Sequence, residues 1–209
     1  MESATFLYFL TASILLTLAP GPDILYLLTK SLADGAKAGI TLAGGLVSGI
    51  VFHTTLVMVG VAALIKSSAT ARLLLKIFGA AYLLFLAFSA LKSARAKKQL
   101  GIRNTKLEIK KPLALYKRGV LMNVLNPKVL LFFLAFLPQF VDLSSDGASL
   151  TILFLGFVFA AQAFVIFSCV AFFAGRVRNL LLRKKNIGQL LNFVEAAVLA
   201  FIALTLLLF

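Results

Sequence analysis

Two short polar segments interrupt otherwise apolar runs of the chain, and each places prolines beside a charged residue. The first is Pro20-Gly21-Pro22-Asp23 and the second is Asn126-Pro127-Lys128. Proline removes a backbone donor and clashes with the carbonyl one turn earlier, so neither run should continue as an unbroken helix. We therefore expect one helix to end before each segment and a new helix to begin at Pro22 and at Pro127, because proline favours the first helical position.

The two segments carry charges of opposite sign. Asp23 falls in the first turn of one new helix, and Lys128 follows Asn126, the expected N-cap of the other. A charge costs roughly 2.5–3.5 kcal/mol at the centre of a membrane span, so it needs a compensating role. One interpretation is a direct ion pair that neutralises a packing contact. The other is a zwitterion site, in which Asp23 receives an ammonium group and Lys128, with the helix N-terminus, receives a carboxylate. Asn123, one turn earlier, could line the same cavity.

Composition indicates what surrounds these segments. Hydrophobic residues make up 61% of the 209 residues and charged residues only 13%, about half the charged share of a soluble globular protein. This composition excludes a soluble enzyme, a disordered tail and a nucleic-acid-binding module. A membrane span needs about 20 apolar residues, and runs of that length predict six helices. They cover Phe6–Leu28, Ala38–Ile65, Ala71–Leu91, Ala114–Phe140, Ser149–Gly175 and Ile187–Phe209.

The basic residues predict how these helices cross the membrane. Seventeen of the 21 Lys and Arg residues lie in the connections between helices one and two, three and four, and five and six. Positively charged connections stay in the cytoplasm, so we expect both termini on the outside. The formal net charge of +14 is then a topology signal and not a nucleic-acid-binding surface.

The two interrupted helices occupy equivalent places, each being the first of three. Residues 1–91 are expected to form one three-helix repeat and residues 119–209 a second, joined by a basic cytoplasmic linker of residues 92–118. With three spans in each half, the second half enters the membrane in the opposite sense, so the repeats are inverted. The expected fold class is therefore an all-α polytopic membrane protein with six transmembrane helices, of which helices 1 and 4 are broken. In such folds the substrate binds where the broken helices meet.

The second predicted span carries a packing signal and one titratable residue. Gly45 and Gly49 have the small-xxx-small spacing that permits close approach of another helix. His53 lies near the middle of the span. It could carry a proton near neutral pH, or it could serve as a neutral hydrogen-bonding residue.

Two further polar residues lie within the fifth and sixth spans. We expect the side chain of Gln162 to form a hydrogen bond between two helices. Glu195 could form a salt bridge with Arg183 or Lys184, or it could exchange protons.

Several longer stretches around these features form a family pattern. They are Leu18–Tyr26, Gly35–Gly39, Gly79–Leu83, Asn123–Lys128 and Phe132–Phe140. Together they resemble the LysE/RhtB family of amino-acid exporters, and the resemblance covers essentially the whole chain. Family members usually carry small residues, often glycine, where this chain has Val194-Glu195-Ala196.

The resemblance implies secondary active export of amino acids or close derivatives across the bacterial inner membrane. It implies an antiporter that lies in the lipid bilayer, is driven by the proton motive force and binds a small amino acid as its substrate. No cofactor and no binding of nucleic acid are expected. The chain could assemble as a homodimer. Export of a metal ion or another small solute is the alternative, although a metal would favour a cluster of carboxylate, His or thiolate ligands. An enzyme is not expected, because one His, one Cys and no HExxH spacing supply neither a metal site nor a nucleophile with its base.

The sequence thus predicts which residues bind the substrate and which take part in proton coupling. Those expected to bind the substrate or to shape its cavity are Asp23, Lys128, Pro20, Gly21, Pro22, Asn126, Pro127 and Asn123, and the candidates for proton coupling are Asp23, His53 and Glu195.

Overall fold

The structure is a computed structural model, and it describes residues 3–61, 68–96, 111–143, 145–183 and 187–208. Within these ranges every regular element is a helix. Four of them are each long and apolar enough to cross a membrane, namely α3 (Ala36–Leu56), α5 (Ala69–Arg95), α8 (Ala148–Arg183) and α9 (Ile187–Leu208). Two bent pairs of helices pass the same test together, which gives up to six spans within these ranges. The predicted all-α, polytopic membrane fold is confirmed.

The bent pairs are the two helices that the sequence predicts to be broken. α1 (Ser3–Leu18) meets α2 (Pro22–Asp34) at 56°, and α6 (Pro112–Val124) meets α7 (Pro127–Leu131) and its continuation at 49°. Each new helix begins with its proline. A proline has no N–H to donate to the preceding turn, so the hydrogen-bond ladder stops there and the chain changes direction.

The second half of helix 4 is less regular than the sequence pattern suggests. α7 lasts little more than one turn and continues as a π-helical turn, η2 (Phe132–Phe136), and a 3₁₀ turn, η3 (Leu137–Phe140). Pro138 has no N–H to donate to the carbonyl of Leu134, so a regular α-helix cannot run through this segment.

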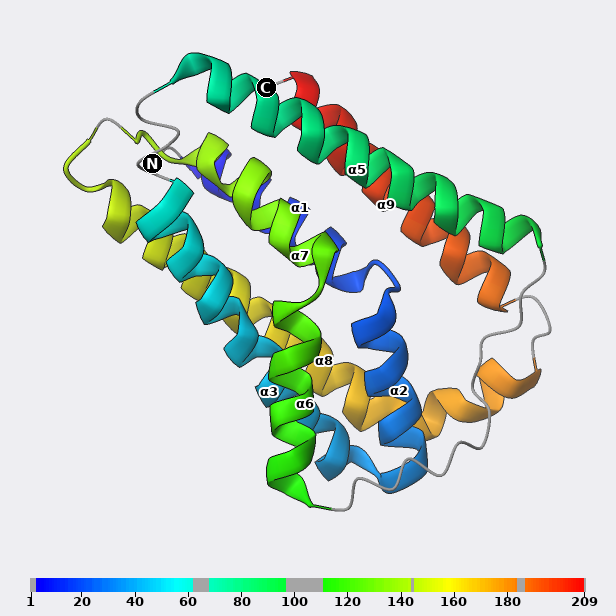
Figure 1. Ribbon diagram of the computed structural model, residues 1–209. Helices are drawn as coiled ribbons and strands as arrows, with labels where there is room; N and C mark the ends of the chain where they lie inside the picture. Colours follow the sequence, from blue (N-terminus) through cyan, green and yellow to red (C-terminus); the bar gives the residue numbers. More distant parts are fainter. Residues whose placement is uncertain (1–2, 62–67, 97–110, 144, 184–186, 209) are drawn as a thin grey trace.

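The helices form two groups with the broken helices between them. α5 and α9 lie side by side along one edge of the molecule, α3, α6 and α8 pack together on the other, and α1 and α7 run between these groups (Figure 1). α3, the second helix of the first half, contacts α6 in the broken helix of the second half. α8, the second helix of the second half, contacts α1 and α2, which form the broken helix of the first half. α5 also contacts α9, and α3 contacts α8. Helices 2 and 5 therefore each contact the broken helix of the other half, and the inverted repeat itself stays a prediction. The division into residues 1–91, 92–118 and 119–209 stays a prediction.

Small residues bring α3 close to α6. A Cβ atom on Gly45 would lie 2.1 Å from the carbonyl oxygen of Tyr116, and one on Gly49 would lie 2.7 Å from side-chain atoms of Asn123. The predicted small-xxx-small pair therefore faces α6. It places the residues just before the second break directly against α3.

The ends of the helices separate into two sets. Both termini lie toward one end of the bundle, at the upper left of Figure 1. The turn from α2 to α3, the last residues of α5 and α8 and the start of α6 lie toward the opposite end. Gly35 forms that first turn with φ of 87°, a conformation that L side chains rarely adopt. The two sets of helix ends therefore lie at opposite ends of the bundle.

Candidate functional site

One asparagine side chain joins the two helix breaks. Asn126 donates from Nδ2 to Oδ2 of Asp23 over 2.6 Å, and its Oδ1 accepts from the backbone N–H of Lys128 at 3.0 Å. Asn126 is thus the N-cap of α7, as the sequence predicts, and it also holds the carboxylate in the first turn of α2. Asp23, Asn126 and Lys128 are at most 8% exposed. The fold therefore brings the two opposite charges to one buried junction.

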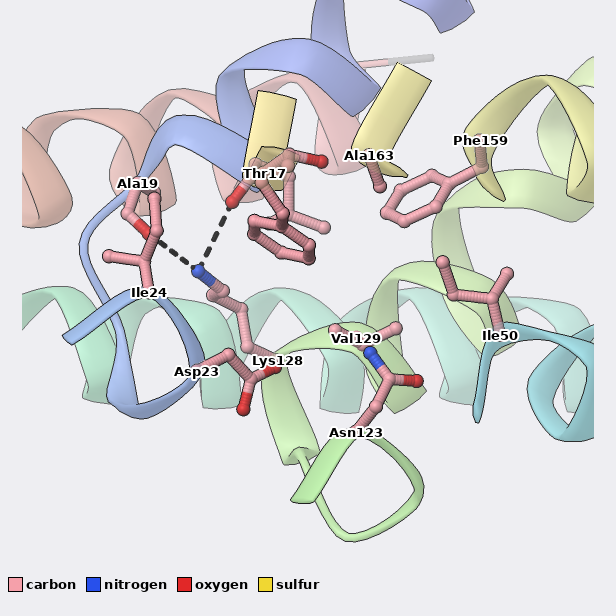
Figure 2. A pocket seen from close by; sticks show the side chains of 12 residues that line it. Thr17, Ala19, Asp23, Ile24, Ile50, Asn123, Lys128, Val129, Phe159 and Ala163 are labelled. Carbon is pink, nitrogen blue, oxygen red and sulfur yellow. Dashed lines mark hydrogen bonds between the residues drawn. The ribbon is translucent and has the colours of Figure 1, made fainter. Parts of the chain in front are cut away.

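The ammonium group of Lys128 reaches across to the end of α1. Nζ donates to the carbonyl oxygens of Leu16 at 3.1 Å and Ala19 at 2.8 Å (Figure 2). In a continuous helix the carbonyl of Leu16 would accept from residue 20, but Pro20 has no N–H. The break thus creates an acceptor that Lys128 uses. An ammonium has three N–H donors, so these two bonds leave one donor for another partner.

Asp23 and Lys128 do not form the direct ion pair that the sequence allows. Among the described residues, the hydrogen bonds of Asp23 and Lys128 go to Asn126 and to main-chain carbonyls respectively. The two charges are held near each other by different partners, and Asp23 acts on Lys128 only through its electrostatic field.

Glu195 of α9 adds a second carboxylate to this junction. A Cβ atom on Gly21 would lie 3.2 Å from Nζ of Lys128 and 3.8 Å from Oε1 of Glu195, so both side chains approach the backbone of the first break. Glu195 also acts electrostatically on Lys128. The fold therefore sets one ammonium group among two carboxylates, with a glycine where a side chain would crowd them.

Arg183 and Lys184 are the salt-bridge partners that the sequence suggests for Glu195. The side chains of Arg183 and Lys184 lie outside the part of the chain that the structure describes.

A small cavity lies beside the junction (Figure 2). Its free volume is about 20 Å³, room for about one water molecule. The polar residues of its lining are Thr17, Asp23, Asn123 and Lys128, and the rest of the lining is apolar. The other predicted site residues form the two breaks around this cavity; they are Pro20, Gly21, Pro22, Asn126 and Pro127.

A polar side chain from the opposite half of the molecule contacts each helix just before its break. His53 of α3 has Nε2 3.0 Å from the carbonyl oxygen of Asn123 in α6. Gln162 of α8 donates from Nε2 to Oγ1 of Thr17 in α1 at 2.9 Å, and lies 3.5 Å from the carbonyl of Ser13. The two contacts are equivalent when the halves are exchanged. The predicted helix–helix role of Gln162 is confirmed, and His53 makes the corresponding contact.

Three buried polar atoms in this region have no hydrogen-bond partner among the described residues. They are Nδ1 of His53, Oδ1 of Asn123 and Oε1 of Gln162. Because a carbonyl can only accept, Nε2 of His53 must carry a proton, and Nδ1 is the acceptor of the neutral ring. Asn123 lines the cavity, and its Oδ1 lies close to Gly49 of α3.

An aromatic cluster fills the space between α1 and the irregular end of helix 4. The ring of Phe9 lies 6.0 Å from that of Phe132 and 5.4 Å from that of Phe140, and Phe132 lies 4.8 Å from Phe136. All four are buried, so these phenylalanines pack the space between the two helices. On the other side of the breaks, the guanidinium of Arg118 in α6 lies 5.0 Å from the ring centre of Tyr26 in α2. Contacts between the two halves therefore exist on both sides of the cavity.

A comparison with protein families matches the sequence of the chain to a known group. The model of the LysE type translocator matches residues 14–208, nearly the whole chain. The chain belongs to the LysE type translocator family. The resemblance seen in the sequence around the two breaks is thereby confirmed, and this LysE family member is a multi-pass membrane protein.

Related LysE-like sequences come from several bacteria. The leucine efflux protein of Salmonella choleraesuis (strain SC-B67) is 27% identical over 184 residues, which are 88% of this chain and 85% of the relative. The leucine efflux protein of Enterobacter sp. (strain 638) is 28% identical over 184 residues, covering 88% and 86%. An uncharacterized membrane protein of Vibrio cholerae serotype O1 is 33% identical over 146 residues, covering 70% and 69%. No solved structure matches the chain.

Proposed function

We propose that this LysE family protein is a secondary active exporter of amino acids or close derivatives across the bacterial inner membrane, and not an enzyme. The observation that carries the proposal is a buried carboxylate and a buried ammonium, Asp23 and Lys128, at two helix breaks that Asn126 joins. Relatives from Salmonella and Enterobacter are named leucine efflux proteins. Their names support an amino acid as the cargo.

The proposed substrate is a zwitterion that lies between the breaks. Asp23 receives the α-ammonium group, and Asn123 lines the same cavity. The α-carboxylate accepts a hydrogen bond from the remaining N–H of Lys128 and is also stabilised by the positive N-terminal end of α2. Charge-assisted hydrogen bonds of this kind are strong in a buried site, because the local dielectric constant is low.

Transport by this site requires the bundle to open. The cavity holds about one water molecule and is too small for an amino acid. Opening toward the termini would separate the aromatic cluster of Phe9, Phe132, Phe136 and Phe140. Opening toward the other end would separate Arg118 from Tyr26. The breaks supply the joints about which the half-helices can rock, so the proposed mechanism is alternating access.

The proposed driving force is the proton motive force. One charge moved across 100 mV releases roughly 2.3 kcal/mol. The candidate residues for proton coupling are Asp23, His53 and Glu195. Asp23 and Glu195 lie close enough to Lys128 for the protonation of either to change the charge balance at the junction.

The proposed orientation follows from the basic connections. We place the connections rich in Lys and Arg in the cytoplasm and both termini outside. The position of the two termini toward one end of the bundle supports this arrangement. A homodimer stays a prediction from the sequence.

Reconstitution tests the proposed function. Purified protein is placed in liposomes loaded with a panel of labelled amino acids, and release is measured with and without an imposed proton gradient and membrane potential. We expect gradient-dependent release of at least one amino acid, which a protonophore removes. Protein-free liposomes are the control. If no amino acid is released while a divalent metal ion or another small solute is, the proposal is wrong.

A further inference from the structure

One wall of the cavity is made only of apolar side chains from a single face of α8. Phe159, Ala163 and Phe167 are spaced four residues apart and line the cavity together. Residues with this spacing lie above one another along a helix. Ile50 of α3 and Val129 of α7 extend the same apolar surface, and all five side chains are at most 6% exposed.

The charged groups lie on the other side of the cavity. Figure 2 shows Asp23 and Lys128 across from Phe159, Ala163 and Ile50. Under the proposed function, the ammonium and carboxylate groups common to all amino acids engage both charges. Glu195 lies at the first break and is not a lining residue, so no charged side chain then remains in the lining for a third charge on the substrate.

The one hydroxyl group of the lining is already engaged. Thr17 donates to the carbonyl of Ser13 at 2.8 Å and accepts from Gln162 at 2.9 Å. A polar substrate side chain that points toward α8 would therefore find only hydrocarbon, and burial of a polar group without a hydrogen bond is unfavourable.

We propose that Phe159, Ala163 and Phe167, which we call the α8 wall, form the subsite for the substrate side chain and select uncharged aliphatic amino acids. This inference rests on the proposed function and adds the substrate class to it. Ala163 lies one turn from each phenylalanine, so its small side chain leaves the only recess in the α8 wall. The recess accepts a branched aliphatic side chain, and the size of residue 163 sets how long that side chain can be.

A substitution at the recess tests the assignment. Ala163→Leu fills the recess, so we expect the ratio of leucine release to alanine release to fall by about tenfold or more, the usual effect of a few methylene-sized changes in an apolar pocket. Retained alanine release shows that the variant is folded. Ala161→Leu is the matched control, because it makes the same change two residues away on the exposed face of α8. We expect its ratio to equal that of the wild type.

A second variant tests the α8 wall in the opposite direction. Phe159→Ala enlarges the subsite, so we expect release of phenylalanine to rise relative to that of leucine. An unchanged leucine-to-alanine ratio in Ala163→Leu, or unchanged phenylalanine release in Phe159→Ala, overturns the assignment. A wild type that releases lysine or glutamate faster than leucine also overturns it but leaves the proposed exporter in place. A wild type that releases no amino acid defeats the proposed function itself.

Discussion

Asn126 donates to the carboxylate of Asp23 over 2.6 Å, and this hydrogen bond links residues that are 103 positions apart in the sequence. The same side chain caps α7 through the backbone N–H of Lys128. A neutral amide therefore connects the two half-helices, while the charges of Asp23 and Lys128 are left for other partners. This division of roles means that the connection and the charge can be tested separately.

Asp23→Asn removes the charge and keeps the connection. The side-chain oxygen of the new amide can still accept from Asn126, so we expect the variant to insert and fold as the wild type does. Export should be lost, because no carboxylate remains for the ammonium group of the substrate. Export is measured as gradient-driven release of labelled amino acid, and folding as the elution profile in detergent. The control is Asp146→Asn at an exposed aspartate in the connection before α8. Wild-type release by Asp23→Asn would remove Asp23 from the mechanism.

Lys128→Met should cost both export and stability. The carbonyl oxygens of Leu16 and Ala19 lose their donor, and an unsatisfied buried group costs about 1–3 kcal/mol. The carboxylates of Asp23 and Glu195 also lose a neighbouring positive charge. We expect a lower melting temperature in detergent.

The double variant Lys128→Met, Glu195→Gln serves as the comparison for that result. Glu195 is half-buried, so removing its carboxylate once the neighbouring ammonium is gone should restore part of the lost stability but not export. A melting temperature that is the same in the single and double variants would show that Glu195 does not act on Lys128.

The breaks were predictable from the sequence because proline acts locally. Pro22 and Pro127 fix where α2 and α7 begin whatever surrounds them, and the Asn126 cap needs only its own backbone. Charges beside such breaks in an apolar run also point to the site, since each needs compensation. The six spans follow from the length of the apolar runs. The positions of the helix ends were predicted less accurately. α8 continues to Arg183, well past the predicted end of the apolar run at Gly175, because the part of a helix that extends into water needs no apolar residues.

The partners of Lys128 depend on the tertiary structure and were not predicted. Pro20 does signal that the carbonyl of Leu16 lacks a helical donor, but nothing local says that a lysine more than one hundred residues later supplies one. The position of Glu195 depends on how α9 packs beside the first break. The cavity wall on α8 was missed for the same reason, because apolar residues in an apolar helix carry no local mark of what they face.

His53 should act as a hydrogen-bond donor to helix 4. His53→Leu removes one of two hydrogen bonds to the carbonyl of Asn123, which still accepts from the backbone N–H of Asn126, so we expect a loss of about 0.5–1.5 kcal/mol in stability together with slower export. His53→Gln keeps a donor, so it should restore most of both. Stability is measured by thermal unfolding in detergent and export by gradient-driven release. A Gln variant that is stable, still exchanges substrate and yet fails to respond to a proton gradient would instead assign proton coupling to His53.

The C-terminus should lie outside the cell. Alkaline phosphatase fused after Phe209 should be active, because this enzyme needs disulfide bonds that form in the periplasm and not in the cytoplasm. The physical reason is the excess of Lys and Arg in the connections at the opposite end of the bundle. A β-galactosidase fusion at the same residue is the complementary measurement and should be inactive. Activity of the second fusion and not of the first would reverse the orientation.

Two neighbouring glycines of α3 provide a test of the contact between the halves. A Cβ atom on Gly45 would lie 2.1 Å from the main-chain oxygen of Tyr116, which cannot move without shifting α6, whereas one on Gly44 would lie 3.9 Å from the Tyr116 ring. Gly45→Ala should therefore destabilise the protein by about 1–3 kcal/mol, as overpacking does. Gly44→Ala should be neutral or stabilise by up to about 1 kcal/mol, because alanine favours a helix over glycine. Thermal unfolding of both variants in the same detergent measures the difference. Equal melting temperatures would mean that α3 and α6 do not meet at Gly45, and the position of Asn123 beside the cavity would then lose its support.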